Sequence, residues 1–243
     1  MGGGVSSGRE TGGSPGKGYE LCLNPRYAWM QKFFSLFPFA RGYLKLEKMR
    51  EADILIRRHV ASKISEAERI LRDAAGAAAQ SLSSLYFASA PTLTPRPMLS
   101  AQPVPPDLHQ RLMDAANKLN MLSADVLYAD SGWAPVSAVQ AIREDEILKL
   151  CEIDDTMLGV AEALSEAARR LDQALRSGNH QEAQQLAADI LAAADRLREI
   201  LELRREFLRF AGGANPGLTD RVKSAVASAR EAIERLLSRV RGG

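Results

Sequence analysis

The most specific chemical pattern in the sequence lies at its first residues. Gly2 is followed by Ser6 at the spacing found where myristate is attached to an N-terminal glycine after removal of the methionine. The pattern is permissive, and a glycine-rich leader also matches it by coincidence. Residues 1–23 are rich in Gly and Ser and contain too little apolar surface to form a core. We therefore expect a disordered leader with Gly2 as its lipidation site.

A short amphipathic helix is predicted directly after this leader. Asn24 and Pro25 suit the N-cap and the first helical position, and Pro38 predicts the end of the helix. On a helical wheel, large apolar residues cover about half of the circumference, a composition typical of helices that lie in a membrane interface. These residues are Tyr27, Trp29, Met30, Phe33, Phe34, Leu36 and Phe37.

Basic residues on and after this helix favour an anionic lipid surface. Lys32 lies on its polar side, and Arg41, Lys45 and Lys48 follow with Glu47 as the single nearby acid. One myristoyl chain binds a bilayer marginally, and each basic residue near an anionic surface adds about 1 kcal/mol. The sequence thus predicts a two-signal membrane anchor. The alternative is that the aromatic helix folds back and caps the core of the protein.

Patterns typical of enzymes and metal sites are missing from the sequence. None of His59, His109 and His180 has a second ligand at the spacing that places two ligands on one helical face. There is no Cys-x-x-Cys and no Gly-x-Ser-x-Gly, and residues 13–18 lack the glycine spacing of a phosphate-binding loop. We predict a protein that is not an enzyme and has no cofactor or metal.

Two further groups of charged residues are open to more than one interpretation. An acidic cluster lacks the central glycine of a calcium loop, so we expect a solvated face, or alternatively a docking surface for a basic partner. Its members are Glu144, Asp145, Glu146, Glu152, Asp154 and Asp155. Arg204 falls in register with the apolar residues Ile200 and Phe207. It is either a polar group for a small-molecule site inside the protein or a side chain that extends to the surface.

The elements that position these residues are predicted to be helices throughout. The chain has 243 residues, of which 46% are apolar and 26% charged, and Ala and Leu dominate its second half. Residues 24–87 are expected to form the aromatic helix and one long helix that starts near residue 40, and residues 88–106 a Pro-rich linker. Residues 107–243 are expected to form an up-down bundle of long antiparallel helices.

Apolar residues spaced by three and four positions define the predicted helices of this bundle. We expect Asp107 to cap the first helix, Ser177 and Gly178 to end the second, and Asn179 with Glu182 to start the third as a capping box. The second helix has an uninterrupted seam like that of a coiled coil. It comprises Leu150, Ile153, Met157, Val160, Leu164, Ala167, Leu171 and Ala174.

These features favour a binding function over a catalytic one. We expect a non-enzymatic helical adaptor or scaffold, held on a membrane surface by its N-terminus and presenting its bundle to protein partners. The alternative is a soluble self-assembling structural protein in which the seam at residues 150–174 pairs with another copy; a third is a bundle with a small-molecule site. A net charge of +2 does not favour nucleic-acid binding, and the expected location is cytoplasmic or peripheral to a membrane.

Overall fold

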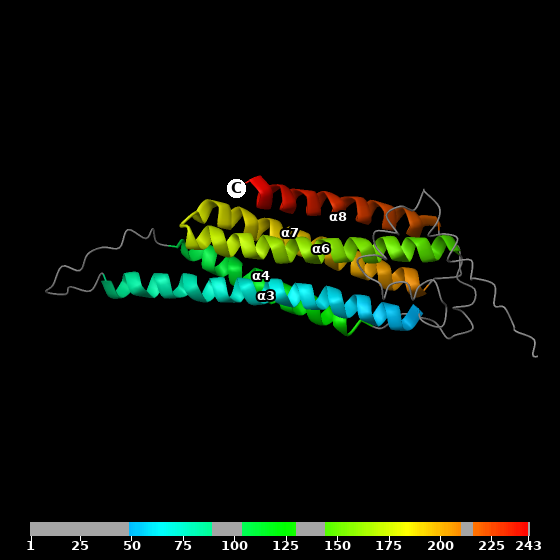
Figure 1. The fold of residues 1–243 in the computed structure, drawn as a ribbon, viewed down its shortest axis with the longest axis horizontal. Helices are drawn as coiled ribbons and strands as arrows, with labels where there is room; N and C mark the ends of the chain where they lie inside the picture. Colours follow the sequence, from blue (N-terminus) through cyan, green and yellow to red (C-terminus); the bar gives the residue numbers. More distant parts are fainter. Residues whose placement is uncertain (1–48, 89–103, 130–143, 210–215, 243) are drawn as a thin grey trace, which may run out of the picture.

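The computed structural model describes residues 49–88, 104–129, 144–209 and 216–242. In these ranges it contains five long helices and no strand, which confirms the prediction of an all-α bundle (Figure 1). The helices are α3 (Met49–Ala88), α4 (Pro106–Leu127), α6 (Glu144–Arg176), α7 (His180–Arg209) and α8 (Pro216–Gly242).

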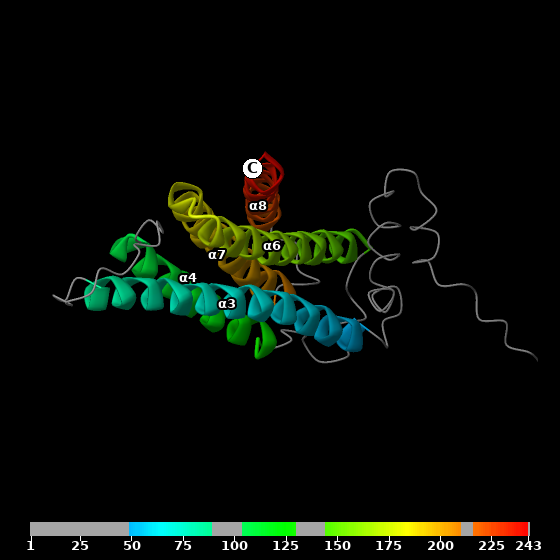
Figure 2. The same cartoon turned by 60° about the vertical axis from the view of Figure 1, so that its left-hand side comes forward.

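Four of the helices form a closed ring, and the fifth lies outside it. α3 packs on α4 and α6, and α7 packs on the same two helices, so α3, α4, α7 and α6 surround a common core. We call these four helices the ring. Helices consecutive in the sequence run in opposite directions, whereas α3 and α6 run in parallel within the ring (Figure 1). α8 packs against α6 and α7 from outside the ring (Figure 2).

The predicted apolar seams form one continuous core. Every residue of the seam at residues 150–174 is buried, and so is the stripe of α3 from Ile56 to Ala78. α6 contacts α3, α7 and α8, and it therefore buries residues on several sides rather than one stripe. In α8 the seam is less enclosed, because Ile233 and Val240 remain only partly buried.

The turn between α6 and α7 follows the local rules of helix ends. Gly178 has a φ of 77°, and the N–H groups of Gly178 and Asn179 donate to the carbonyls of Leu175 (3.0 Å) and Ala174 (2.8 Å). This pattern is a Schellman motif, whose left-handed residue is most often glycine because glycine has no Cβ. The Asn179 side chain then accepts the Glu182 N–H at 3.2 Å, as predicted for the start of α7. The Glu182 carboxylate bonds the Asn179 side-chain amide (2.8 Å).

The predicted cap of α4 is wrong. The helix begins at Pro106 and its N-cap is Pro105, with no side-chain hydrogen bond at the cap. Proline suits the first helical position because it has no N–H to be left without a partner. Asp107 lies in the first turn, where the positive end of the helix dipole stabilises its negative charge. Its carboxylate accepts a hydrogen bond from Gln184 of α7 (3.2 Å).

Candidate functional sites in the bundle

The site residues predicted from the sequence precede the described part of the chain. They are Gly2, Tyr27, Trp29, Met30, Lys32, Phe33, Phe34, Phe37, Arg41, Lys45 and Lys48. All of them fall within residues 1–48, outside the residues that the structure describes, and the lipidation and membrane contacts expected there stay predictions.

Inside the ring lies a cluster of four charged side chains that we call the ionic cluster. Asp53 and Arg57 come from α3, Asp154 from α6 and Arg204 from α7. Arg204 is 1% exposed, and both aspartates are 0% exposed. Charged groups this deeply buried are stable only when they are paired and hydrogen-bonded.

Arg204 connects the two aspartates across three helices. Its Nε donates to Asp154 Oδ1 at 2.6 Å, and its Nη2 donates to Asp53 Oδ1 at 2.5 Å. The other carboxylate oxygen of Asp53 accepts from Arg57 Nε at 3.1 Å and Nη2 at 2.8 Å. Asp53 is therefore shared by two guanidinium groups, and each guanidinium uses the planar geometry that favours carboxylates.

Arg57 extends the ionic cluster to the fourth helix of the ring. Its Nη1 donates to the carbonyls of Ala129 (2.6 Å) and Leu127 (3.3 Å), at the C-terminal end of α4. The last carbonyls of a helix have no partner within the helix and carry the negative end of its dipole. The cation of Arg57 satisfies these carbonyls and fixes the end of α4 against α3.

The ionic cluster corrects two interpretations of the sequence. Arg204 does not extend to the surface, and Asp154 is not part of a solvated acidic face. The signal for Asp154 was present, because it lies four residues after Leu150 and three before Met157, on the buried side of α6. With two aspartates and two arginines paired, the ionic cluster is formally neutral. Its hydrogen bonds join α3, α6 and α7 to one another and α3 to the end of α4.

Four large apolar side chains of α3, α4 and the residue after α4 are exposed, and we call them the apolar surface. Its members are Ile54, Met121, Leu127 and Tyr128, with Met121 59% and Tyr128 80% exposed. Arg57 bonds the Leu127 carbonyl, and Ile54 lies within one turn of Arg57, so the start of α3 meets the end of α4 here. Contiguous exposed apolar residues mark interaction sites more often than isolated ones do.

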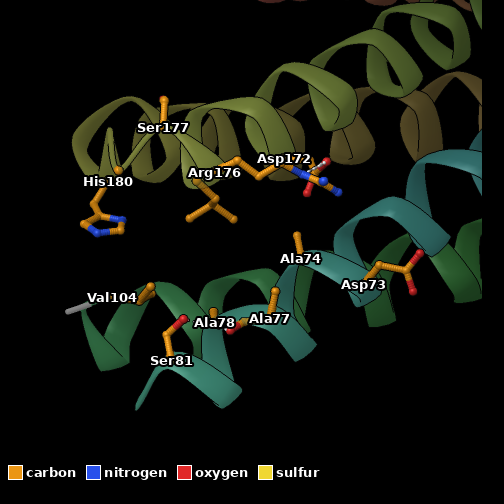
Figure 3. Close-up of a pocket in the computed structure, with 12 residues that line it drawn as sticks. Asp73, Ala74, Ala77, Ala78, Ser81, Val104, Asp172, Arg176, Ser177 and His180 are labelled. Carbon is orange, nitrogen blue, oxygen red and sulfur yellow. Dashed lines mark hydrogen bonds and ion pairs between the residues drawn. The ribbon is translucent and has the colours of Figure 1, made fainter. Parts of the chain in front are cut away.

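An open cleft of about 820 Å³ lies at the opposite end of the bundle. Figure 3 shows the α6–α7 turn facing the alanine-rich surface of α3 across this cleft. The lining residues are Asp73, Ala74, Ala77, Ala78, Ser81, Val104, Asp172, Leu175, Arg176, Ser177, Gly178 and His180. Its carboxylates are already paired, Asp172 with Arg176 (2.9 Å) and Asp73 with Arg69 (3.3 Å). Both carboxylates among the described lining residues thus have a cationic partner on their own helix.

A histidine forms a further contact between two helices of the ring. His109 Nδ1 lies 3.1 Å from the Ala75 carbonyl and joins α4 to α3. Among the residues that the structure describes, no three His, Cys, Asp or Glu side chains are placed to share a metal ion. Within the same ranges, no helix has the length and apolar character needed to cross a bilayer.

Comparison with known proteins gives no relative from which a function can be transferred. No protein-family model matches the sequence, and no curated protein or solved structure matches it either. The function of this chain is therefore inferred from its own residues and geometry.

Proposed function

We propose that the protein is a non-enzymatic helical scaffold that binds a protein partner through the apolar surface and is held at a membrane by its N-terminal residues. The observation that supports partner binding most directly is the exposure of four large apolar side chains, of which Met121 and Tyr128 are the most exposed. Aromatic and methionine side chains are enriched at protein interfaces, and tyrosine is among the residues that contribute most to binding.

The ionic cluster supports this proposal because it holds the apolar surface in place. Arg57 bonds the carbonyls of Leu127 and Ala129, the residues on either side of Tyr128. The backbone that presents Tyr128 is thus fixed to α3 by a buried cation, although the Tyr128 side chain is exposed. A surface that is ordered before binding loses less conformational entropy when the partner arrives.

The position of the apolar surface also suits attachment at the N-terminus. α3 begins at Met49, directly after the basic residues that we expect to contact anionic lipid, and Ile54 lies in its first turns. The end of α4 lies at the same end of the bundle as the start of α3 (Figure 1). In this proposal a partner binds the scaffold close to the membrane anchor.

Liposome flotation tests the membrane attachment. The protein is co-expressed with a myristoyl transferase and mixed with anionic vesicles, and intact mass confirms the lipid. We expect the wild type to float and both Gly2→Ala and Trp29→Ala/Phe33→Ala to remain at the bottom, because one signal alone binds marginally. If no form floats, the membrane is removed from the proposal and a soluble assembly is favoured. If all forms float equally, Gly2 and the aromatic helix are not the anchor.

Proximity labelling in cells that make the protein tests the partner-binding surface. The variant Met121→Ser/Tyr128→Ser removes the two most exposed apolar side chains, and Gln181→Ser on an exposed position of α7 serves as the control. We expect the double variant to lose a labelled partner that the wild type and the control both retain, with helical content unchanged. Identical labelling of all three proteins would contradict the assignment of this surface.

A further inference from the structure

The apolar surface lies close to the point at which the chain enters the bundle. α3 begins at Met49, and Ile54 lies about 8 Å along this helix at 1.5 Å per residue. Arg57, one turn further on, donates to the carbonyl of Leu127 at 3.3 Å and so brings the end of α4 to the start of α3. The segment that precedes α3 is therefore joined to the bundle beside the apolar surface.

The apolar surface extends over two helices. Met121 and Tyr128 are seven residues apart, which is about two helical turns, so both lie on one side of α4 and its end. They form a stripe about 10 Å long, and Ile54 of α3 is exposed at the end of the bundle where this stripe ends. No helix in the described ranges covers these side chains. A short amphipathic helix has the dimensions and the apolar face to cover them.

We propose that the predicted aromatic helix, residues 25–37, occupies the apolar surface of its own chain when no membrane is present, and that membrane binding frees this surface for the partner. The inference rests on the proposed function, because it names what controls access to the same surface. The apolar residues of the aromatic helix cover about half of its circumference, and burying them removes a large apolar area from water. The same side chains cannot be buried in lipid and against the bundle at once.

The covalent connection favours the aromatic helix over any separate molecule as the occupant. Residues 38–48 join it to α3, and a segment of this length spans at most about 40 Å when fully extended. A binding group held by a short linker has an effective concentration of the order of millimolar. A separate partner at a lower concentration is therefore excluded until lipid removes the aromatic helix from the apolar surface.

Charges at the edge of the apolar surface suit the same occupant. Glu51 is exposed in the first turn of α3, one turn before Ile54. Lys32 lies on the polar side of the predicted aromatic helix. A cation on this helix gives Glu51 a counter-charge beside the apolar contact, and anionic lipid competes for the same cation. Both the apolar and the charged side chains of the aromatic helix thus have two alternative binding surfaces.

Fluorescence of Trp29 in the full chain tests the contact. The chain has two tryptophans, and Trp133→Phe leaves Trp29 as the only one. Without vesicles, we expect Trp29 to be shielded from acrylamide and to have a blue-shifted emission. Adding Met121→Ser/Tyr128→Ser should remove most of this shielding and shift the emission to the red. Gln181→Ser, on an exposed position at the start of α7, is the matched control and should change neither.

Three results of this measurement would overturn the contact. Trp29 would be quenched as readily as free tryptophan before any change to the apolar surface is made. Its shielding would persist in Met121→Ser/Tyr128→Ser, which would place the aromatic helix elsewhere. Its shielding would disappear on dilution, which would assign the contact to a second copy of the chain.

Oxidation of Met121 by dilute peroxide, followed by peptide mass spectrometry, tests the release. We expect Met121 of the myristoylated full chain to oxidise slowly alone and faster with phosphatidylserine vesicles. In Trp29→Ala/Phe33→Ala it should oxidise fast in both, and Met157, which is 0% exposed, should stay slow throughout.

The oxidation experiment separates failure of the release from failure of the membrane attachment. Vesicles that float the protein without faster oxidation of Met121 overturn the release and leave the attachment standing. Vesicles that do not bind the protein overturn both, whereas the shielding of Trp29 still decides the contact within the chain.

Discussion

The interior of the ring and the contact of α8 use ion pairs in opposite ways. In the ring, Asp53, Asp154 and Arg204 are almost completely buried and share hydrogen bonds across three helices. Along α8, Arg221, Arg230 and Arg239 each pair with a carboxylate of α6 or α7 near the surface, and the Arg230 side chain is 51% exposed. Arginine–carboxylate pairs therefore fix the arrangement of the ring helices from inside, whereas at α8 they lie only at the edge of an apolar contact.

This difference has an energetic consequence. A buried ion pair contributes little net stability over apolar residues of similar size, but removing one partner leaves the other charge buried and unpaired. An exposed pair is solvated whether or not it forms, so losing it changes little. A single substitution in the ionic cluster should consequently destabilise all four helices of the ring together. In contrast, α8 should separate from the ring without unfolding it.

The largest effect is expected from Arg204→Ala. This change leaves Asp53 and Asp154 buried with fewer partners, and we expect the free energy of unfolding to fall by about 3–5 kcal/mol. Urea denaturation followed by circular dichroism measures it. In Arg204→Met/Asp154→Leu one cation and one anion are removed together, so most of this loss should be recovered. If the double variant is as unstable as the single one, an unpaired buried charge is not the cause of the lost stability.

A smaller effect confined to α8 is expected from Gly159→Leu. The new side chain meets Ile233, and overpacking of this kind costs about 1–3 kcal/mol. We expect α8 to become susceptible to limited proteolysis while α6 and α7 stay resistant. Gly76→Leu in α3 is the matched control, because a Cβ there has no neighbour within 4 Å. Equal proteolysis of α6, α7 and α8 in Gly159→Leu would show that α8 is not separable.

An exposed pair between two ring helices should give the protein a defined dependence on acid. The hydrogen bond from Arg169 of α6 lowers the pKa of Glu66 in α3 from 4.5 to about 2. Because the pKa is lower in the folded state, the stabilisation is present above pH 4.5 and is lost as the pH falls toward 2. Glu66→Gln should reduce the loss of stability across this window in acid titrations of urea unfolding. An unchanged acid profile would mean that this pair does not form in solution.

The smallest effect is expected from Arg230→Ala. Its pair with Glu152 is exposed, so the free energy of unfolding should change by less than about 1 kcal/mol, and less in high salt. Urea unfolding at low and high salt measures the change in the free energy of unfolding and its dependence on salt. A loss as large as that of Arg204→Ala would remove the contrast between the ring and α8.

The helices and many of their ends could be predicted from the sequence because these features are local. The spacing of Leu150 to Ala174 predicted a buried seam, and Ser177-Gly178 predicted the end of α6. Both depend on residues within a few turns of one another. The order of helices around the ring was not predictable in the same way, because an apolar stripe indicates that a face is buried and not which helix covers it.

The ionic cluster could not be predicted from the sequence for a related reason. Arg204 stands out in the sequence because it interrupts an apolar register, but its partners Asp53 and Asp154 are distant in the sequence. Asp154 was misassigned because neighbouring acids made it resemble a solvated face, although its position relative to Leu150 and Met157 places it on the buried side. Pairing between distant charges becomes evident only after the helices are assembled.

Hydrogen exchange of the backbone amides of the wild-type chain tests the separation of α8 from the ring most directly. We predict that amides of α8 exchange through an opening of lower free energy than amides in the middle of α6 and α7, and that the slowest amides of α3, α4, α6 and α7 share one value. If the amides of α8 instead exchange only with global unfolding, at the same free energy as those of α6 and α7, then the five helices form a single cooperative unit and the account of α8 as a separable helix is wrong.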